Sequence, residues 1–211
     1  EVVEVNELIK RFRFVTLDGS PMPAFSGGAH TVVEMDDHGT RRLNPYSLMS
    51  DPEDRSGYEI SVRRDDVGRG GSLYMHRHVQ PGLEIEISYP VNLFPLDTRA
   101  RKHLMIAGGI GITPFLAQIA QLSHFGGRFE LHYAARSKPL GAYMDRLMAI
   151  HPDQVAIINA AFTPSEKEVT WAREIVQLFK DNPGAGTIGL RGQMIDRPHL
   201  VRAERILARS A

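Results

Sequence analysis

The stretch LMIAGGIGITPFLAQIAQL, residues 104–122, decides how the rest of the chain is interpreted. Its first residues, Leu104–Ala107, form an apolar run with the length of a buried strand. The run is followed by three glycines and a Thr-Pro pair: Gly108, Gly109, Gly111, Thr113 and Pro114. Thr is a favoured N-cap residue and Pro is favoured in a first turn, so the order strand, glycine turn, helix is predicted.

A helix start of this kind attracts anions. Its unpaired N–H groups and positive dipole end favour phosphate, and glycines let a ligand approach the backbone. A dinucleotide pyrophosphate is therefore the expected ligand. The alternative is a tight connection packed against its own sheet, with no ligand.

The composition bounds the remaining possibilities. Lys plus Arg equals Asp plus Glu at 25 each over 211 residues, so no overall charge draws the chain to nucleic acid or to an anionic membrane. No apolar run reaches membrane-spanning length and no signal-peptide pattern is present, so a cytoplasmic protein is expected. Cysteine is absent, which excludes thiolate zinc and a cysteine-ligated iron–sulfur cluster in this chain.

The first hundred residues show short β-rich runs separated by turn residues. The expected strands are Glu1–Val5, Arg11–Leu17, His30–Glu34, Tyr58–Arg63 and Leu83–Ser88. Strands at this spacing without long helical periods predict a small antiparallel barrel. A short helix is expected over Ser72–His78.

Two strings in this half carry polar and glycine residues: Asn44-Pro45-Tyr46-Ser47-Leu48 and Gly68-Arg69-Gly70-Gly71-Ser72. The backbone amides and the Ser72 hydroxyl of the second string would bind an anion. Each string taken alone is better explained as a structural turn.

Taken in order with the glycine turn, the strings are similar to a known family. The pattern NPYSLMSDP, YEISVRRDDVGRGGS, PVNLFPL, HLMIAGGIGITP, FELHYAARS resembles the phthalate dioxygenase reductase and vanillate demethylase reductase family, within the ferredoxin–NADP reductase superfamily. The resemblance covers residues 1–147. It implies a flavin-binding barrel, a Rossmann-like nicotinamide domain, FMN and NADH or NADPH as cofactors, and hydride transfer from nicotinamide to flavin. No side chain acts as acid or base in this chemistry.

The resemblance also implies site residues. Those expected for flavin are Asn44, Tyr46, Ser47, Leu48, Arg63, Gly70, Gly71 and Ser72, with Tyr46 against the isoalloxazine and Ser47 at its N5 edge. Those expected for the nicotinamide dinucleotide are Gly108, Gly109, Gly111, Thr113, Pro114, Arg136 and Ser137.

One departure from the family concerns the flavin phosphate. The family carries an arginine two residues before the tyrosine, and this chain has Asn44 there. A neutral amide loses a charge-assisted bond, so weaker FMN binding is expected unless Arg41, Arg42 or Arg69 supplies the charge.

The next parallel strand is expected over Arg128–Tyr133, and Arg136-Ser137 follows it, where an open α/β sheet meets the adenosine ribose. That position has no acidic residue to accept a hydrogen bond from a ribose 2′-hydroxyl. The choice between NADH and NADPH stays open, as does a solvated basic turn without a ligand.

After residue 147 the resemblance ends. Residues 148–211 instead resemble the C-terminal tail of the citrate lyase beta subunit and malyl-CoA lyase family, through AAFTPSEKEVTWAREIV and GAGTIGLRGQMIDRPHLVRAERIL. The residues themselves predict a helix after a Thr163–Glu166 capping box, paired strands at Thr187–Leu190 and Gln193–Ile195, and a last helix opened by Pro198. The lyase barrel and its metal-binding acids are missing, so Asp196 is expected only to start a helix.

The expected organisation is an FMN-binding barrel at 1–98, a partial NAD(P)-binding α/β domain at 99–147 and a mainly helical tail at 148–211. The expected function is an NAD(P)H-dependent flavin reductase that passes electrons to a separate oxygenase or ferredoxin-like acceptor. Two alternatives stay open: a flavin- or nucleotide-binding chimera or remnant without turnover, and a CoA-ester carbon–carbon lyase fragment. A natural fusion, an engineered chimera and an assembly error would leave the same sequence.

Overall fold

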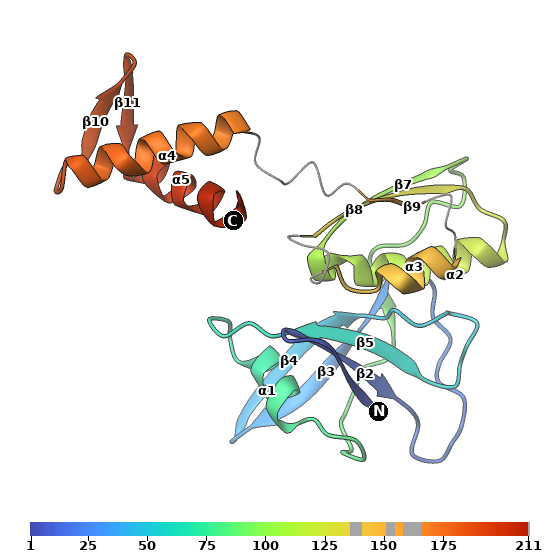
Figure 1. Ribbon diagram of the computed structural model, residues 1–211. Coiled ribbons are helices and arrows are strands. Elements are labelled where there is room, and N and C mark those ends of the chain that lie inside the picture. Colours follow the sequence, from blue (N-terminus) through green and yellow to red (C-terminus); the bar gives the residue numbers. More distant parts are fainter. Residues whose placement is uncertain (136–140, 151–154, 158–165, 211) are drawn as a thin grey trace. The chain divides into compact units, whose positions relative to one another are not determined.

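The computed structural model describes residues 1–135, 141–150, 155–157 and 166–210 (Figure 1). The chain divides into two units, Glu1–Ile157 and Ile158–Ala211. Each has its own hydrophobic core, and each is described by itself below.

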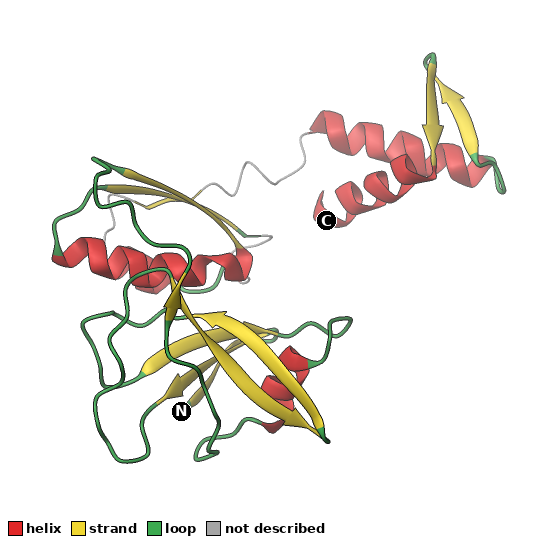
Figure 2. Cartoon of the chain, turned by 180° about the vertical axis from the view of Figure 1, so that it is seen from behind, coloured by secondary structure: helices red, strands yellow, loops and turns green. Residues whose placement is uncertain are grey.

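The first half of the larger unit is an antiparallel barrel. Its strands and helix are β1 (Val2–Asn6), β2 (Ile9–Phe14), β3 (Ala29–Asp37), β4 (Thr40–Ser47), β5 (Tyr58–Arg63), α1 (Gly71–His78) and β6 (Val91–Asn92). They form two three-stranded sheets, in the orders β1-β2-β5 and β4-β3-β6 (Figure 2). Alternation along the strands places one face of each sheet inward, as expected for half-buried antiparallel strands. The buried side chains include Phe12, Val33, Tyr58, Ile60 and Met75.

The structure corrects two strand expectations in this half. The string around Asn44 lies in the strand β4, although Pro45 lacks an N–H group. The sheet tolerates it because β4 is an edge strand. The predicted strand Leu83–Ser88 is wrong as a continuous strand: an isolated bridge joins Ile87 to Val33, and two further backbone bonds hold the segment against β3.

The second half of this unit is the α/β part. It comprises β7 (His103–Gly108), a 3₁₀ turn η1 (Gly109–Ile112), α2 (Thr113–His124), β8 (Phe129–Ala134), α3 (Met144–Ile150) and β9 (Val155–Ile157). The strands are parallel in the order β7-β8-β9, with α2 and α3 against the same face (Figure 1). The predicted order strand, glycine turn, helix and the parallel pairing are confirmed.

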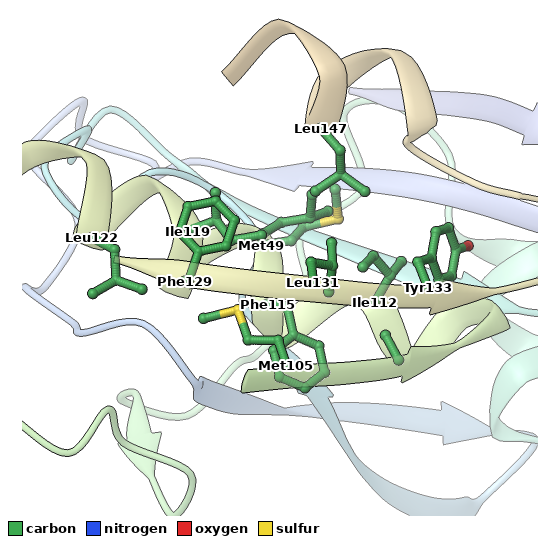
Figure 3. Packing of buried hydrophobic residues seen from close by; sticks show 12 residues of the cluster. Met49, Met105, Ile112, Phe115, Ile119, Leu122, Phe129, Leu131, Tyr133 and Leu147 are labelled. Carbon is green, nitrogen blue, oxygen red and sulfur yellow. The ribbon is translucent and has the colours of Figure 1, made fainter. Parts of the chain in front are cut away.

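One face of this sheet is packed and the other is open. Met105, Phe129 and Leu131 are buried against the helices, together with Ile119 and Leu147 (Figure 3). The alternate residues of β7 point the other way, and Leu104 and Ile106 are 63% and 69% exposed.

The start of α2 differs in detail from the expectation. Thr113 has helical dihedrals and the N-cap position is Ile112, without a side-chain capping bond. The Thr113 hydroxyl donates instead to the Ile110 carbonyl at 3.1 Å. Thr113 is therefore the first helical residue rather than the cap, because the preceding 3₁₀ turn already runs into the helix.

Specific contacts join the barrel to the α/β part. Met49, the second residue after β4, is buried in the α/β core among the residues drawn in Figure 3. The Gly27 N–H donates to the Gln121 side chain at 2.6 Å, and Arg146 pairs with Glu59 at 2.8 Å. The two halves of Glu1–Ile157 thus hold a fixed mutual position.

The smaller unit contains α4 (Glu166–Asp181), β10 (Thr187–Leu190), β11 (Gln193–Asp196) and α5 (Arg197–Ser210). The predicted hairpin is confirmed: β10 and β11 pair antiparallel across Arg191-Gly192, which both have positive φ. Asp196 starts α5 as expected, because its carboxylate accepts the His199 N–H at 3.3 Å. Thr163 and the rest of the predicted capping box up to residue 165 lie outside the described residues.

No helix within the described residues has both the length and the apolar character needed to cross a membrane. The predicted domain limits at residues 98 and 147, and the lyase resemblance of the tail, stay predictions.

Candidate functional site

The loop before α1 has the features of an anion-binding turn. Gly70 occupies the N-cap position with φ 94°, and no side chain caps the helix. The first turn of α1 carries no acidic residue. The Ser72 hydroxyl accepts the Asp65 N–H at 3.0 Å, which folds the loop back on itself. The first N–H groups of α1 are therefore left for an anion.

Strand β4 places Arg42, Asn44 and Tyr46 on one of its faces, and the Arg42 and Asn44 side chains lie against this loop. A Cβ atom added at Gly71 would lie 2.6 Å from the Asn44 amide oxygen, and one added at Gly70 would lie 2.9 Å from the Arg42 guanidinium carbon. Only glycine permits so close an approach. The loop thus packs closely on β4, and the two together are called the cradle below.

Arg42 is the arginine that the structure brings to the cradle. Its Nε donates to the Asp37 carboxylate at 2.8 Å and its Nη1 donates to the Arg69 carbonyl. Arg41 lies on the other face of β4 and pairs with Glu34 at 2.6 Å. Of the two neighbouring arginines on β4, Arg42 is therefore the one whose guanidinium contacts the loop.

Tyr46 has a buried hydroxyl that makes no hydrogen bond within the described part of the chain. Burial raises the pKa of Tyr46 to about 12. The nearby Asn44 side chain opposes this rise, although it makes no hydrogen bond to the Tyr46 hydroxyl. A buried polar atom without a partner is costly, so a bound ligand that accepts this O–H would stabilise the arrangement.

The remaining flavin candidates differ in accessibility. Ser47 is half-buried at the end of β4, and Arg63 is exposed at the end of β5. Leu48 is completely buried, and its N–H donates to the Ala29 carbonyl at 2.9 Å. Leu48 therefore acts through packing, and any ligand contact would have to involve its backbone carbonyl.

The glycine turn after β7 leaves its backbone open. Cβ atoms added at Gly108, Gly109 or Gly111 would meet nothing within 4 Å. Gly109 has φ 53°, and its carbonyl accepts the Tyr133 hydroxyl at 3.0 Å, which fixes the turn on β8. Pro114 lies in the first turn of α2, which has no side-chain cap and no acidic residue. Thr113 is 7% exposed, beneath the turn.

The fold brings the two half-sites onto neighbouring elements. Strand β5 contacts η1, so the glycine turn lies beside the strand that ends at Arg63. The Ser61 and Tyr143 hydroxyls bond to each other across this junction. Arg136 and Ser137, expected at the adenosine ribose, lie outside the described residues.

Sequence reasoning missed two features of this region. The Ser61–Tyr143 contact joins residues 82 positions apart and has no local signal. The sequence did contain a signal that favours Arg42 over Arg41. The i, i+2 spacing of Arg42, Asn44 and Tyr46 places these three side chains on one face of a strand.

Known proteins share this arrangement. The carnitine monooxygenase reductase subunit of Escherichia coli K12 is 47% identical over 152 residues, which are 72% of this chain and 47% of that protein. The vanillate O-demethylase oxidoreductase of Pseudomonas putida is 38% identical over 174 residues, or 82% of this chain and 52% of that protein. A solved phthalate dioxygenase reductase structure superposes with a TM-score of 0.71 at 35% identity, covering 85% of this chain and 54% of that one.

Over the matched residues, this chain is a homologue of the phthalate dioxygenase and vanillate demethylase reductases. It spans about half the length of the curated relatives that it matches. No family model matches it. The reductase homologue has the barrel and the Rossmann-like α/β part of the ferredoxin–NADP reductase superfamily.

Proposed function

We propose that the reductase homologue binds FMN and NAD(P)H and passes electrons to a separate oxygenase or ferredoxin-like acceptor. The observations that support this most are two glycine-containing helix starts: the cradle at Gly70 and Gly71, closely packed against Arg42 and Asn44, and the turn at Gly108–Gly111, whose backbone is open.

The cradle fits the phosphate of FMN. Arg42 would supply the positive charge, and the uncapped N–H groups of α1 would donate to phosphate oxygens. Tyr46 has an unpartnered hydroxyl on the same strand face. When bound, FMN would accept a two-electron reducing equivalent from NAD(P)H and release single electrons.

The protein's own contribution is binding, orientation and exclusion of water. The glycine turn would bring its amides to the pyrophosphate, and Tyr133 would hold the turn through the Gly109 carbonyl. The contacts of Met49, Glu59 and Gln121 between the barrel and the α/β part would fix the alignment of the two cofactors. None of these roles requires a general acid or base.

An iron–sulfur acceptor would have to lie outside these 211 residues, because they contain no cysteine to ligate a cluster. A cytoplasmic location is part of the proposal, and its support is the need for NAD(P)H as reductant. The rival is a binding remnant without turnover, favoured by a parallel sheet with only three strands in the described residues.

The deciding experiment is an anaerobic absorbance titration of the FMN-loaded protein with NADH and then NADPH. We expect the flavin bands to bleach, and the faster coenzyme to be the preferred one. Bound flavin that stays oxidised would favour the remnant, and a protein that takes up no FMN would overturn the proposal.

The substitution Gly111→Ala tests the glycine turn while leaving the flavin cradle unchanged. Its added methyl meets no protein atom within 4 Å, so the fold should tolerate it, but it fills space on the ligand side. We expect FMN binding to persist while bleaching by NAD(P)H slows about tenfold, for a clash of ~1–3 kcal/mol. Chemical reduction by dithionite should be unaffected.

A further inference from the structure

Asp37, His38 and His78 lie together on the barrel surface, away from the glycine turn. One potential ligand atom from each side chain lies within 4.8 Å of those of the other two. His38 and His78 are exposed, and their ring centroids are 6.1 Å apart at an interplanar angle of 89°. The residues come from two elements: the β3–β4 hairpin and the last position of α1.

Both elements hold their residues firmly. In the hairpin, Asp37 pairs with Thr40, and His38 and Gly39 form the two-residue turn with φ 52° and 83°. In α1, Met75 is completely buried in the barrel core, and His76 donates from Nε2 to the Val62 carbonyl at 2.8 Å. Donors on such anchored elements are placed more accurately than donors on free loops.

The two imidazoles are free to act as ligands. Neither makes a hydrogen bond within the described part of the chain, and His78 contacts the Tyr74 ring at 5.0 Å. Four ligands at about 2.0–2.1 Å from zinc lie roughly 3.4 Å apart in a tetrahedron, so modest rotations of two exposed side chains suffice.

Asp37 retains a free oxygen for a cation. Both contacts from Arg42 go to Asp37 Oδ2, at 2.7 and 2.8 Å, which leaves Oδ1 available. The Arg42 charge opposes a dication nearby, so two neutral imidazole donors are needed to hold it.

We propose that Asp37, His38 and His78 bind a divalent cation of the zinc, nickel or copper class, clipping the β3–β4 hairpin to the end of α1. Two imidazoles and one carboxylate are the donor set that these ions share, and exposure leaves a further position for water. Because Asp37 also pairs with Arg42 of the proposed phosphate cradle, the test uses neither flavin nor nucleotide.

The test is a zinc titration of the untagged, chelator-treated full chain in competition with a chromogenic chelator. We expect one equivalent to bind, and the double variant His38→Asn/His78→Asn to bind at least about tenfold more weakly, since loss of an outer partner alone costs 10–100-fold. Asn suits position 38 because it tolerates the left-handed conformation there. His103→Asn, on β7, is the matched control and should bind zinc like the original chain.

Two further measurements test the proposed cation site. Saturating zinc should raise the melting temperature of the original chain and of His103→Asn but not of the double variant. Cobalt substitution should give visible bands of a four-coordinate site only where both histidines are present. Equal zinc affinity in the double variant and the original chain would mean an adventitious ion only and would overturn the proposal.

Discussion

In the proposed function, Arg42 supplies positive charge to the phosphate cradle. Its guanidinium is held between the Asp37 carboxylate and the Arg69 carbonyl, beside the left-handed Gly70. The amide of Asn44 adjoins Gly71 and can donate a hydrogen bond, but it carries no charge. In the proposed function, Arg42 would therefore make the phosphate contact that the resemblance assigns to an arginine at position 44, two residues further along the same strand face.

Arg42→Ala should weaken FMN binding by about 10–100-fold, because a hydrogen bond to a charged group contributes ~1.5–3 kcal/mol. The measurement is a fluorescence titration with FMN and, in parallel, with riboflavin. Riboflavin lacks the phosphate, so its affinity should be unchanged by the substitution. An equal loss for both ligands would show that Arg42 supports the fold of the loop and not the phosphate.

Arg41→Ala is the matched control for this prediction. Arg41 adjoins Arg42 in sequence but faces away and pairs with Glu34. We expect its removal to leave the FMN affinity within about twofold, as for an exposed pair whose contribution is small.

His76 gives α1 a pH-dependent attachment. Burial disfavours its cation and lowers its pKa below the usual 6.5, while its hydrogen bond to the Val62 carbonyl opposes the shift. The unfolded chain therefore binds a proton at a pH where the folded chain does not. Stability from this group is complete above pH 6.5 and is lost as the pH falls toward the lowered folded pKa.

We expect the free energy of unfolding, measured in urea, to fall between pH 7.5 and 5.5 by at most about 1.4 kcal/mol per pH unit from this residue. His76→Gln, which keeps an N–H donor but does not titrate, should flatten the profile in this window. A profile of His76→Gln as steep as that of the original chain would contradict the assignment.

At the scale of elements, the sheet β7-β8-β9 is packed on one face only. Leu131 is completely buried against α2 and α3, whereas Leu104 on the opposite face of β7 is 63% exposed. The same substitution at these two positions therefore measures the asymmetry of the sheet.

Leu131→Ala should lower the free energy of unfolding by about 2–5 kcal/mol, as for a large-to-small change in a core. Leu104→Ala should change it by less than about 1 kcal/mol. Chemical denaturation of both variants provides the measurement. A cost at Leu104 comparable with that at Leu131 would mean that another surface covers this face in solution.

The elements also show why some predictions from the sequence were right and others wrong. Periodicity was sufficient for β5, β7, α2 and the β10–β11 hairpin, where local spacing and turn residues agree with the tertiary structure. It was insufficient for β4, because Pro45 indicates a turn and only the edge position in the sheet makes it acceptable.

Missing β4 also affected the site. Once the segment is known to be a strand, its alternation separates Arg42 from Arg41 and selects the arginine at the cradle. The Ser61–Tyr143 contact and the Asp37–His38–His78 cluster could not be predicted, since each joins segments that only the folded chain brings together.

At the scale of the whole molecule, the described cofactor candidates all lie in Glu1–Ile157. Among the residues whose side chains the structure describes, the buried clusters of that unit draw none from beyond position 147. The cluster around Ala172, Ile175 and Ile195 likewise draws none from before position 169. The described cores therefore divide where the two units divide.

A chain ending at Ile157 should accordingly bind FMN, and be reduced by NAD(P)H, within about twofold of the full chain, as expected for independent parts of a structure. The measurement is the same anaerobic absorbance titration on both forms, with circular dichroism to establish that the shorter chain is folded. Retained FMN with lost reduction would assign the second unit a role in the nicotinamide half. Loss of FMN from a folded 1–157 chain would assign it a role at the barrel, which none of the described barrel contacts requires.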